Sequence, residues 1–196
     1  MPFLSEKAAS AVSASAGGGY LNPSKIQSGS SVRFALLSDA PLEYYEIWGE
    51  STEGAVKPFR FANEPTPEDI SAEFGSEFSR RLNREGSAPE PAKFGISVPV
   101  FNHDTGSVQV LAITQKSINR ELDAISQMDD YSNLLEWDFV LSKEGNGLNT
   151  EYSLRAVPRK KGSEAKIKEA WNAAQEEGFD ISRLMTGGNP FKESQN

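Results

Sequence analysis

Two segments with alternating apolar residues, joined by a short polar turn, lie near the middle of the chain. Residues 94–101 read Phe-Gly-Ile-Ser-Val-Pro-Val-Phe, and residues 107–113 read Ser-Val-Gln-Val-Leu-Ala-Ile, with Asn-His-Asp-Thr-Gly between them. Apolar side chains at every second position are typical of a strand with one buried face, and the intervening residues favour a turn. The two segments therefore predict a β-hairpin, and Pro99 places its first strand at an edge or a bulge.

Further strand-like segments lie on both sides of this hairpin, and a segment with helical spacing follows it. The predicted order is strand 32–37, inserted material, strand 94–101, strand 107–114, helix 117–128, strand 136–142 and strand 150–157. Five strands with a helix between the third and fourth is the order of an OB barrel, although other small α+β folds share parts of it. We predict a mainly β fold with accessory helices: a five-stranded OB-fold barrel with an inserted segment and a C-terminal helix.

The composition along the chain predicts one domain with appendages. Residues 1–19 end in a stretch of only Ala, Ser, Val and Gly, which favours a flexible arm. Residues 20–161 form the predicted OB-fold domain. Proline-rich and acidic residues 63–91 look like an insertion packed on its outside. Residues 162–196 are predicted to contain a C-terminal helix and a tail, which is expected to be loose from Met185 onward.

A helix is predicted to begin in the insertion, because an acidic first turn follows Pro65 and Pro67. Phe74 and Phe78, four residues apart, would give that helix an apolar stripe. Two short aromatic-rich segments precede the insertion, at residues 42–48 and 56–61. The second contains a proline, so it belongs at a sheet edge if it is a strand.

The composition also excludes several classes of protein. The chain has no cysteine, so it has no disulfide framework, thiolate zinc site or cysteine nucleophile. No apolar run approaches the roughly 20 residues of a membrane-spanning helix, and residues 1–19 lack the pattern of a signal peptide. We expect a cytoplasmic protein that does not associate with membranes.

Reactive groups that would support catalysis do not converge in the sequence. His103 is the single histidine, and its position in a turn predicts an exposed residue more readily than a general base. Neither of the glycine-rich phosphate-binding motifs occurs. The carboxylate pairs Asp129–Asp130 and Glu176–Glu177 are more typical of solvated helix ends than of a magnesium site. We predict that the protein is not an enzyme and carries no cofactor or metal.

The net charge of −8 argues at first against a nucleic-acid partner, because phosphate binding needs clustered Lys and Arg. Half of that charge lies in residues 63–90, which hold three basic and seven acidic residues (3 − 7 = −4). The remaining body is nearly balanced and can present one basic face. The charge therefore weakens a nucleic-acid hypothesis without excluding it.

Cations and aromatic side chains lie close together in several of the predicted strands. Arg33 precedes Phe34, and residues 57–61 read Lys-Pro-Phe-Arg-Phe. Bases stack on aromatic rings while cations follow the phosphates, so this grouping favours single-strand binding. Two basic groups stay open: residues 80–84 hold three arginines that favour pairing with Glu77 and Glu85 along a helix, and residues 158–161 fit either a phosphate contact or a linker.

These residues resemble a known family. Segments 30–43, 57–60, 98–102, 109–118 and 147–153, with Trp48 and Trp137-Asp-Phe, are similar to phage single-stranded DNA-binding proteins, most of all those of marine cyanobacterial phages. The likeness covers about residues 28–158. It implies an OB-fold protein, related in role to the helix-destabilising protein of T-even phages, that coats single strands during phage replication, recombination and repair in the infected host cell.

The chain departs from that family in two respects. Without cysteines it lacks the zinc subdomain of the T-even relative, so residues 40–91 must be built differently. Residues 162–196 are only mildly acidic, which weakens recruitment of partners through an acidic tail. The helix around Trp171 is the alternative surface of this segment for phage replication or recombination proteins. The alternative to DNA binding is a protein-interaction or virion-associated module that uses an OB-like barrel.

The site expected from the residues and the resemblance is a groove that binds single-stranded DNA with little sequence preference. The predicted phosphate contacts are Arg33, Lys57, Arg60, Lys93, Lys116 and Arg155. The predicted stacking residues are Tyr44, Tyr45, Trp48, Phe59 and Phe101.

Overall fold

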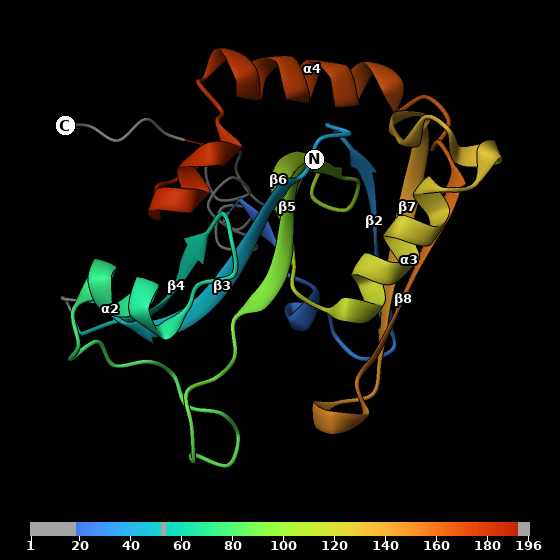
Figure 1. The fold of residues 1–196 in the computed structure, drawn as a ribbon. Coiled ribbons are helices and arrows are strands. Elements are labelled where there is room, and N and C mark those ends of the chain that lie inside the picture. The colour runs from blue at the N-terminus through green and yellow to red at the C-terminus, as the bar shows by residue number, and fades with distance from the viewer. Residues whose placement is uncertain (1–18, 52–53, 192–196) are drawn as a thin grey trace, which may run out of the picture.

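A computed structural model describes residues 19–51 and 54–191, and strands dominate it (Figure 1). The predicted arm, apart from Gly19, lies outside the described residues. In chain order the elements are β1 (Tyr20–Leu21), η1 (Pro23–Lys25), β2 (Ser30–Leu36), β3 (Leu42–Glu50), β4 (Val56–Phe61), α2 (Pro67–Phe74), β5 (Lys93–Asn102), β6 (Ser107–Ile113), α3 (Lys116–Ser126), η2 (Asp129–Tyr131), η3 (Leu134–Glu136), β7 (Trp137–Glu144), η4 (Gly147–Asn149), β8 (Glu151–Pro158), α4 (Glu164–Glu176) and η5 (Ile181–Thr186). The mainly β class with accessory helices is confirmed, and each strand and helix of the predicted order is present within about two residues.

The strands form one mixed sheet whose main order is β1-β6-β5-β2-β7-β8. Every pairing is antiparallel except that of β1 with β6. Strand β5 is long enough to pair with β2 through one half and with β3 through the other, and β4 then pairs with β3. The described strands do not close into a barrel, because β1 and β8 end the series without pairing to each other.

The core lies between one face of this sheet and helix α3, which runs beside β8 in Figure 1. Alternate residues of the strands supply it, including Phe34, Val100, Leu111 and Phe139. Ile118 and Ile125, seven residues apart, are the buried residues of α3. This spacing returns to the same helix face after two turns, so the pattern that predicted the helix also explains its orientation.

Strands β3 and β4 extend away from the main sheet and carry helix α2 (Figure 1). Helix α2 begins with a complete capping box between Thr66 and Asp69 and ends at Phe74, where Gly75 takes a φ of 85°. The prediction that Phe78 continues this helix is wrong. Phe78 instead stacks on Phe74 from the following turn, with ring centroids 4.6 Å apart.

The C-terminal segment packs on the sheet, and the expectation of a loose tail from Met185 is wrong for the described residues. Phe179 contacts Trp171 of α4 and Phe191, with ring centroids 5.3 and 5.2 Å apart. Phe191 also meets Tyr20 edge to face, and Pro190 is buried. These contacts bind the C-terminal segment to the first strand. No helix among the described residues is long and apolar enough to cross a membrane.

Candidate nucleic-acid interface

The predicted DNA-binding residues do not form one surface, because neighbouring residues of a strand face opposite sides of the sheet. Nine of them fall into four places: a buried cluster beneath η5, the aromatic cluster under α2, a buried carboxylate in β7, and a groove beside α3. Trp48 and Arg155 lie apart from all four. The first three places hold structural contacts, and the groove is the candidate interface.

Tyr44 and Arg60 belong to the buried cluster, so neither is available to DNA. Tyr44 is 1% exposed and its hydroxyl lies 3.0 Å from the Ser97 hydroxyl. The Arg60 side chain, 12% exposed, lies 4.9 Å from the Tyr44 ring centroid and 3.2 Å from the Glu46 carboxylate. It also donates to the Leu184 carbonyl of η5 at 3.1 Å. Both predicted contacts are therefore wrong, because the C-terminal segment covers this face of the sheet.

Phe59 belongs to an aromatic cluster that attaches α2 to β4. Its ring centroid lies 4.8 Å from that of Phe74 and 5.2 Å from that of Phe78. Lys57 lies on the same face, with its ammonium 5.5 Å from the centre of the Phe59 ring. Phe59 is therefore a packing residue, while Lys57 is exposed and lies outside the groove described below.

Trp48 lies on β3, where this strand pairs with β4, and its side chain contacts two charged neighbours. Its indole nitrogen donates to Glu46 at 2.8 Å, and the Arg81 guanidinium lies 5.8 Å from its ring centroid. Arg81 also pairs with Glu90 at 3.6 Å. The prediction that the arginines of residues 80–84 pair with Glu77 and Glu85 along a helix is wrong. Residues 75–92 form no helix, and Arg81 pairs with Glu90 instead.

Arg33 contacts a buried carboxylate. Asp138, with no exposed side-chain surface, lies in β7 beside β2. Arg33 Nε donates to Asp138 at 2.8 Å, Arg159 Nη1 donates at 3.0 Å, and the Lys160 amide donates at 2.9 Å. His103 Nε2 lies 3.0 Å from the same carboxylate. The His103 side chain is 4% exposed, so the prediction of an exposed turn residue is wrong.

These contacts explain why a carboxylate is tolerated inside the sheet. Burial alone raises the pKa of Asp138, but the contacts with His103, the Lys160 amide and Arg33 outweigh it and hold that pKa below its ordinary value. Phe101, 4% exposed, packs edge to face on His103 and is not available for stacking. Arg155 is exposed on β8, one strand beyond this cluster.

The Asp138 carboxylate should make the stability of the protein dependent on pH in acid. Because its pKa is lower in the folded protein, its ionised form stabilises the fold above the unfolded pKa near 4. That contribution is lost as pH falls through the folded pKa. We expect the difference in unfolding free energy between the wild type and Asp138→Asn to shrink as the pH falls below about 4. Urea unfolding at each pH measures it, and a difference that grows in acid would contradict this assignment.

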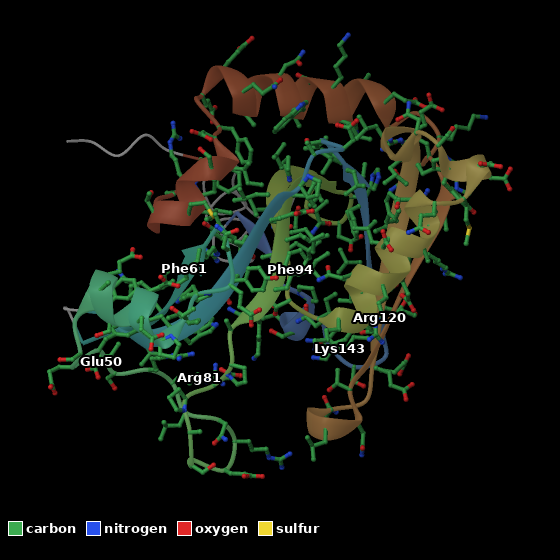
Figure 2. All side chains as sticks on the ribbon, in the orientation of Figure 1. Glu50, Phe61, Arg81, Phe94, Arg120 and Lys143 are labelled. Carbon is green, nitrogen blue, oxygen red and sulfur yellow. The ribbon has the colours of Figure 1, made fainter. Side chains whose placement is uncertain are left out.

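The groove brings together the remaining predicted residues, Tyr45, Lys93 and Lys116. It consists of two neighbouring hollows that share Phe94, Asn119 and Arg120 in their walls. We call them the basic hollow and the apolar hollow. Figure 2 labels Phe94, on β5 near the middle of the molecule, and Arg120, on helix α3.

The basic hollow, of about 710 Å³, combines two aromatic rings with four cations and two carboxylates, Glu64 and Glu90. Tyr45 and Phe94 are cross-strand partners on β3 and β5, with ring centroids 5.6 Å apart, and Phe94 is 43% exposed. The cations come from the loop after α2, from the start of β5 and from the first turns of α3: Arg84, Lys93, Lys116 and Arg120.

Three of these cations have a charge that no carboxylate neutralises. Lys93 pairs with Glu90, which Arg81 also contacts. Among the described residues, no acidic group forms an ion pair with Arg84, Lys116 or Arg120. Exposed cations without ion pairs beside the exposed Phe94 ring are the combination that favours binding of single-stranded nucleic acids.

The apolar hollow, of about 430 Å³, lies between helix α3 and the sheet. Its wall is formed mainly by apolar residues of β2, β5, α3 and η3, such as Leu36, Ile96, Val98, Leu122 and Leu134. Three acidic residues and one cation also line it, whereas four cations and two acidic residues line the basic hollow, so the two hollows differ in charge.

The sequence patterns do not identify Phe94 or Arg120 as site residues, and they predict ion pairs for Arg84. Phe94 begins the alternating strand of the first hairpin, so the pattern alone assigned it to the core or to the edge. Arg120 follows Lys116 by four residues in α3, and this spacing places both on one helix face. A search for cations one turn apart would have found the pair.

Comparisons with models of protein families, with curated proteins and with solved structures found no match to this chain. The residues that the structure describes contain no group of three His, Cys, Asp or Glu side chains placed to hold a metal ion.

Proposed function

We propose that the protein binds single-stranded DNA, with little sequence preference, along the basic hollow. The observation that carries this proposal is the pair Tyr45 and Phe94 beside three cations without acidic partners. Phosphates would follow Arg84, Lys116 and Arg120, and bases would stack on the exposed face of Phe94. We further propose that the protein protects and organises single strands during phage replication, recombination and repair, as the family resemblance implies, and that it catalyses no reaction.

The strand order supports an OB-like origin for this site. Strands β6-β5-β2-β7-β8 pair in the order of the third, second, first, fourth and fifth strands of an OB barrel, and α3 connects β6 to β7 as the helix of that fold does. The barrel is open where β6 would meet β8, and β1 pairs with β6 instead. We therefore propose an opened OB fold in which β3, β4 and α2 form the insertion.

Replacing Phe94 by alanine tests the stacking part of this proposal. Base–aromatic stacking contributes roughly 1–3 kcal/mol per base, so we expect affinity for a labelled oligo-dT to fall by between about fivefold and a hundredfold. Leu148→Ala is the matched control, because Leu148 is an exposed apolar residue outside the groove. Thermal unfolding checks that both variants fold. Equal affinities of Phe94→Ala and the wild type would remove Phe94 from the site.

A further inference from the structure

We propose that the groove contains a further phosphate subsite, between Lys93 and Arg81, which the carboxylate of Glu90 occupies and closes to DNA. This inference rests on the proposed function and deepens it, because it states which part of the positive charge beside the groove a strand cannot use. Three observations carry it: the two ion pairs of Glu90, the hydrogen bonds that hold its loop, and the exposure of the three side chains.

Glu90 is a counter-ion shared by two cations. One of its carboxylate oxygens lies 2.5 Å from Lys93 Nζ, and the other lies 3.6 Å from Arg81 Nε. Glu90 and Lys93 lie in the wall of the basic hollow, so the two ion pairs connect Arg81 to it. Carboxylate and phosphate oxygens accept hydrogen bonds from the same ammonium and guanidinium donors. The Glu90 carboxylate therefore lies where a phosphate would accept from Lys93 and Arg81 together.

Hydrogen bonds of the main chain hold the loop that carries Arg81 and Glu90. The Arg81 amide donates to the Trp48 carbonyl of β3 at 2.7 Å, and the Glu90 amide donates to the Arg81 carbonyl at 2.8 Å. The Arg80 guanidinium also donates to the Glu90 carbonyl, at 2.7 Å. Because Arg81 and Glu90 lie on paired stretches of chain, the contact between their side chains is built into the loop.

The three side chains of the subsite differ in exposure. The Glu90 side chain is 20% exposed, whereas those of Lys93 and Arg81 are 46% and 55% exposed. The cations are therefore accessible to a strand, while the carboxylate that holds them is screened by salt less than a surface group is. In the view of Figure 2, Arg81 and Arg120 lie on opposite sides of Phe94, so the subsite continues the groove beyond this ring.

The occupied subsite limits the affinity of the groove for a single strand. A phosphate that approaches Lys93 and Arg81 is repelled by the Glu90 carboxylate and must compete with it for both cations. Removing the carboxylate charge while keeping the shape of the side chain frees the two cations for one more phosphate. This additional contact is expected to raise the affinity about fivefold. It should also steepen the dependence of log K on log salt by about 0.7.

The variant Glu90→Gln of the full chain tests this inference, by anisotropy titration of labelled oligo-dT at several salt concentrations. We expect it to bind about fivefold more tightly than the wild type at moderate salt, with a slope of about −2.7 in place of about −2. Glu85→Gln is the matched control and should keep the wild-type slope. Glu85 is an exposed acid of the same loop and, among the described residues, forms no ion pair. Thermal unfolding checks that the variants fold, and Glu90→Ala is used if Glu90→Gln does not.

The slope also shows whether the gain in affinity passes through the two cations. Loss of a repelling carboxylate raises the affinity by itself, but only a new contact between a cation and a phosphate releases a further counter-ion. The comparison is therefore between Arg81→Ala/Lys93→Ala and the triple variant Arg81→Ala/Lys93→Ala/Glu90→Gln. These two variants should have equal slopes, because neither has a cation at the subsite.

A wild-type slope in Glu90→Gln would overturn the subsite while the proposed function stands. A slope that steepens equally in Glu85→Gln, or on adding Glu90→Gln to Arg81→Ala/Lys93→Ala, would also overturn it, because the effect would then come from the net charge of the protein. Absence of binding to oligo-dT by the wild type and by Glu90→Gln would contradict the proposed function itself.

Discussion

Replacing Asp138 by alanine is expected to lower the free energy of unfolding by about 3–5 kcal/mol at pH 7. The carboxylate is fully buried, and the Arg33 and Arg159 guanidinium groups and the Lys160 amide donate to it. Its removal leaves these donors without their acceptor in a partly buried place. Such a loss is a large share of the roughly 5–15 kcal/mol that stabilises a typical domain.

Urea unfolding measures this change, with Asp104→Ala as control. Asp104 is an exposed acid in the turn after β5, so its replacement should change the unfolding free energy by less than about 0.5 kcal/mol. A loss below about 1 kcal/mol in Asp138→Ala would contradict the structural role of the carboxylate. It would also reopen the prediction that Arg33 is free to contact phosphates.

The double variant Lys116→Ala/Arg120→Ala is expected to weaken binding to oligo-dT by roughly thirtyfold. Both side chains are exposed and lack acidic partners, so each phosphate contact is worth about 1 kcal/mol. Each lost contact should also reduce the salt dependence of log K by about 0.7 for a single strand. The slope should therefore fall by about 1.4, and anisotropy titrations at several salt concentrations measure both changes.

The matched control removes two positive charges outside the groove. Lys57 and Arg155 are exposed cations on β4 and β8, and neither lies in the wall of either hollow. Lys57→Ala/Arg155→Ala should keep the wild-type slope and lose little affinity. A loss in this control that equals the loss in Lys116→Ala/Arg120→Ala would mean that binding follows total charge, and the groove would not be the site.

The sequence predicts the strands and helix α3 well because alternation and helical spacing are local patterns. The alternation within residues 94–113 predicts the hairpin in which β5 and β6 pair. Closure of the barrel is different, since it depends on whether β6 meets β8 or another strand. Tyr20 and Leu21 take that edge with a two-residue pairing, which is too short to leave a pattern.

The candidate site is harder to predict because a sequence does not say which face of a sheet is covered. Tyr44 and Tyr45 are neighbours, yet η5, more than a hundred residues later, packs over the side of Tyr44 and leaves Tyr45 beside the groove. Arg33 meets its acid partner 105 residues away. One signal was present: Asp138 interrupts the apolar segment Trp137-Asp-Phe-Val-Leu, and a carboxylate inside a buried strand requires cationic or amide partners.

The most direct test of single-strand binding is an anisotropy titration of labelled oligo-dT at low and moderate salt, with a duplex of equal length as control. Three unpaired cations in the groove predict tighter binding to the single strand than to the duplex. They also predict a loss of log K with log salt of slope about −2. Absence of binding to oligo-dT at low salt, where attraction to phosphates is least screened, would contradict the account.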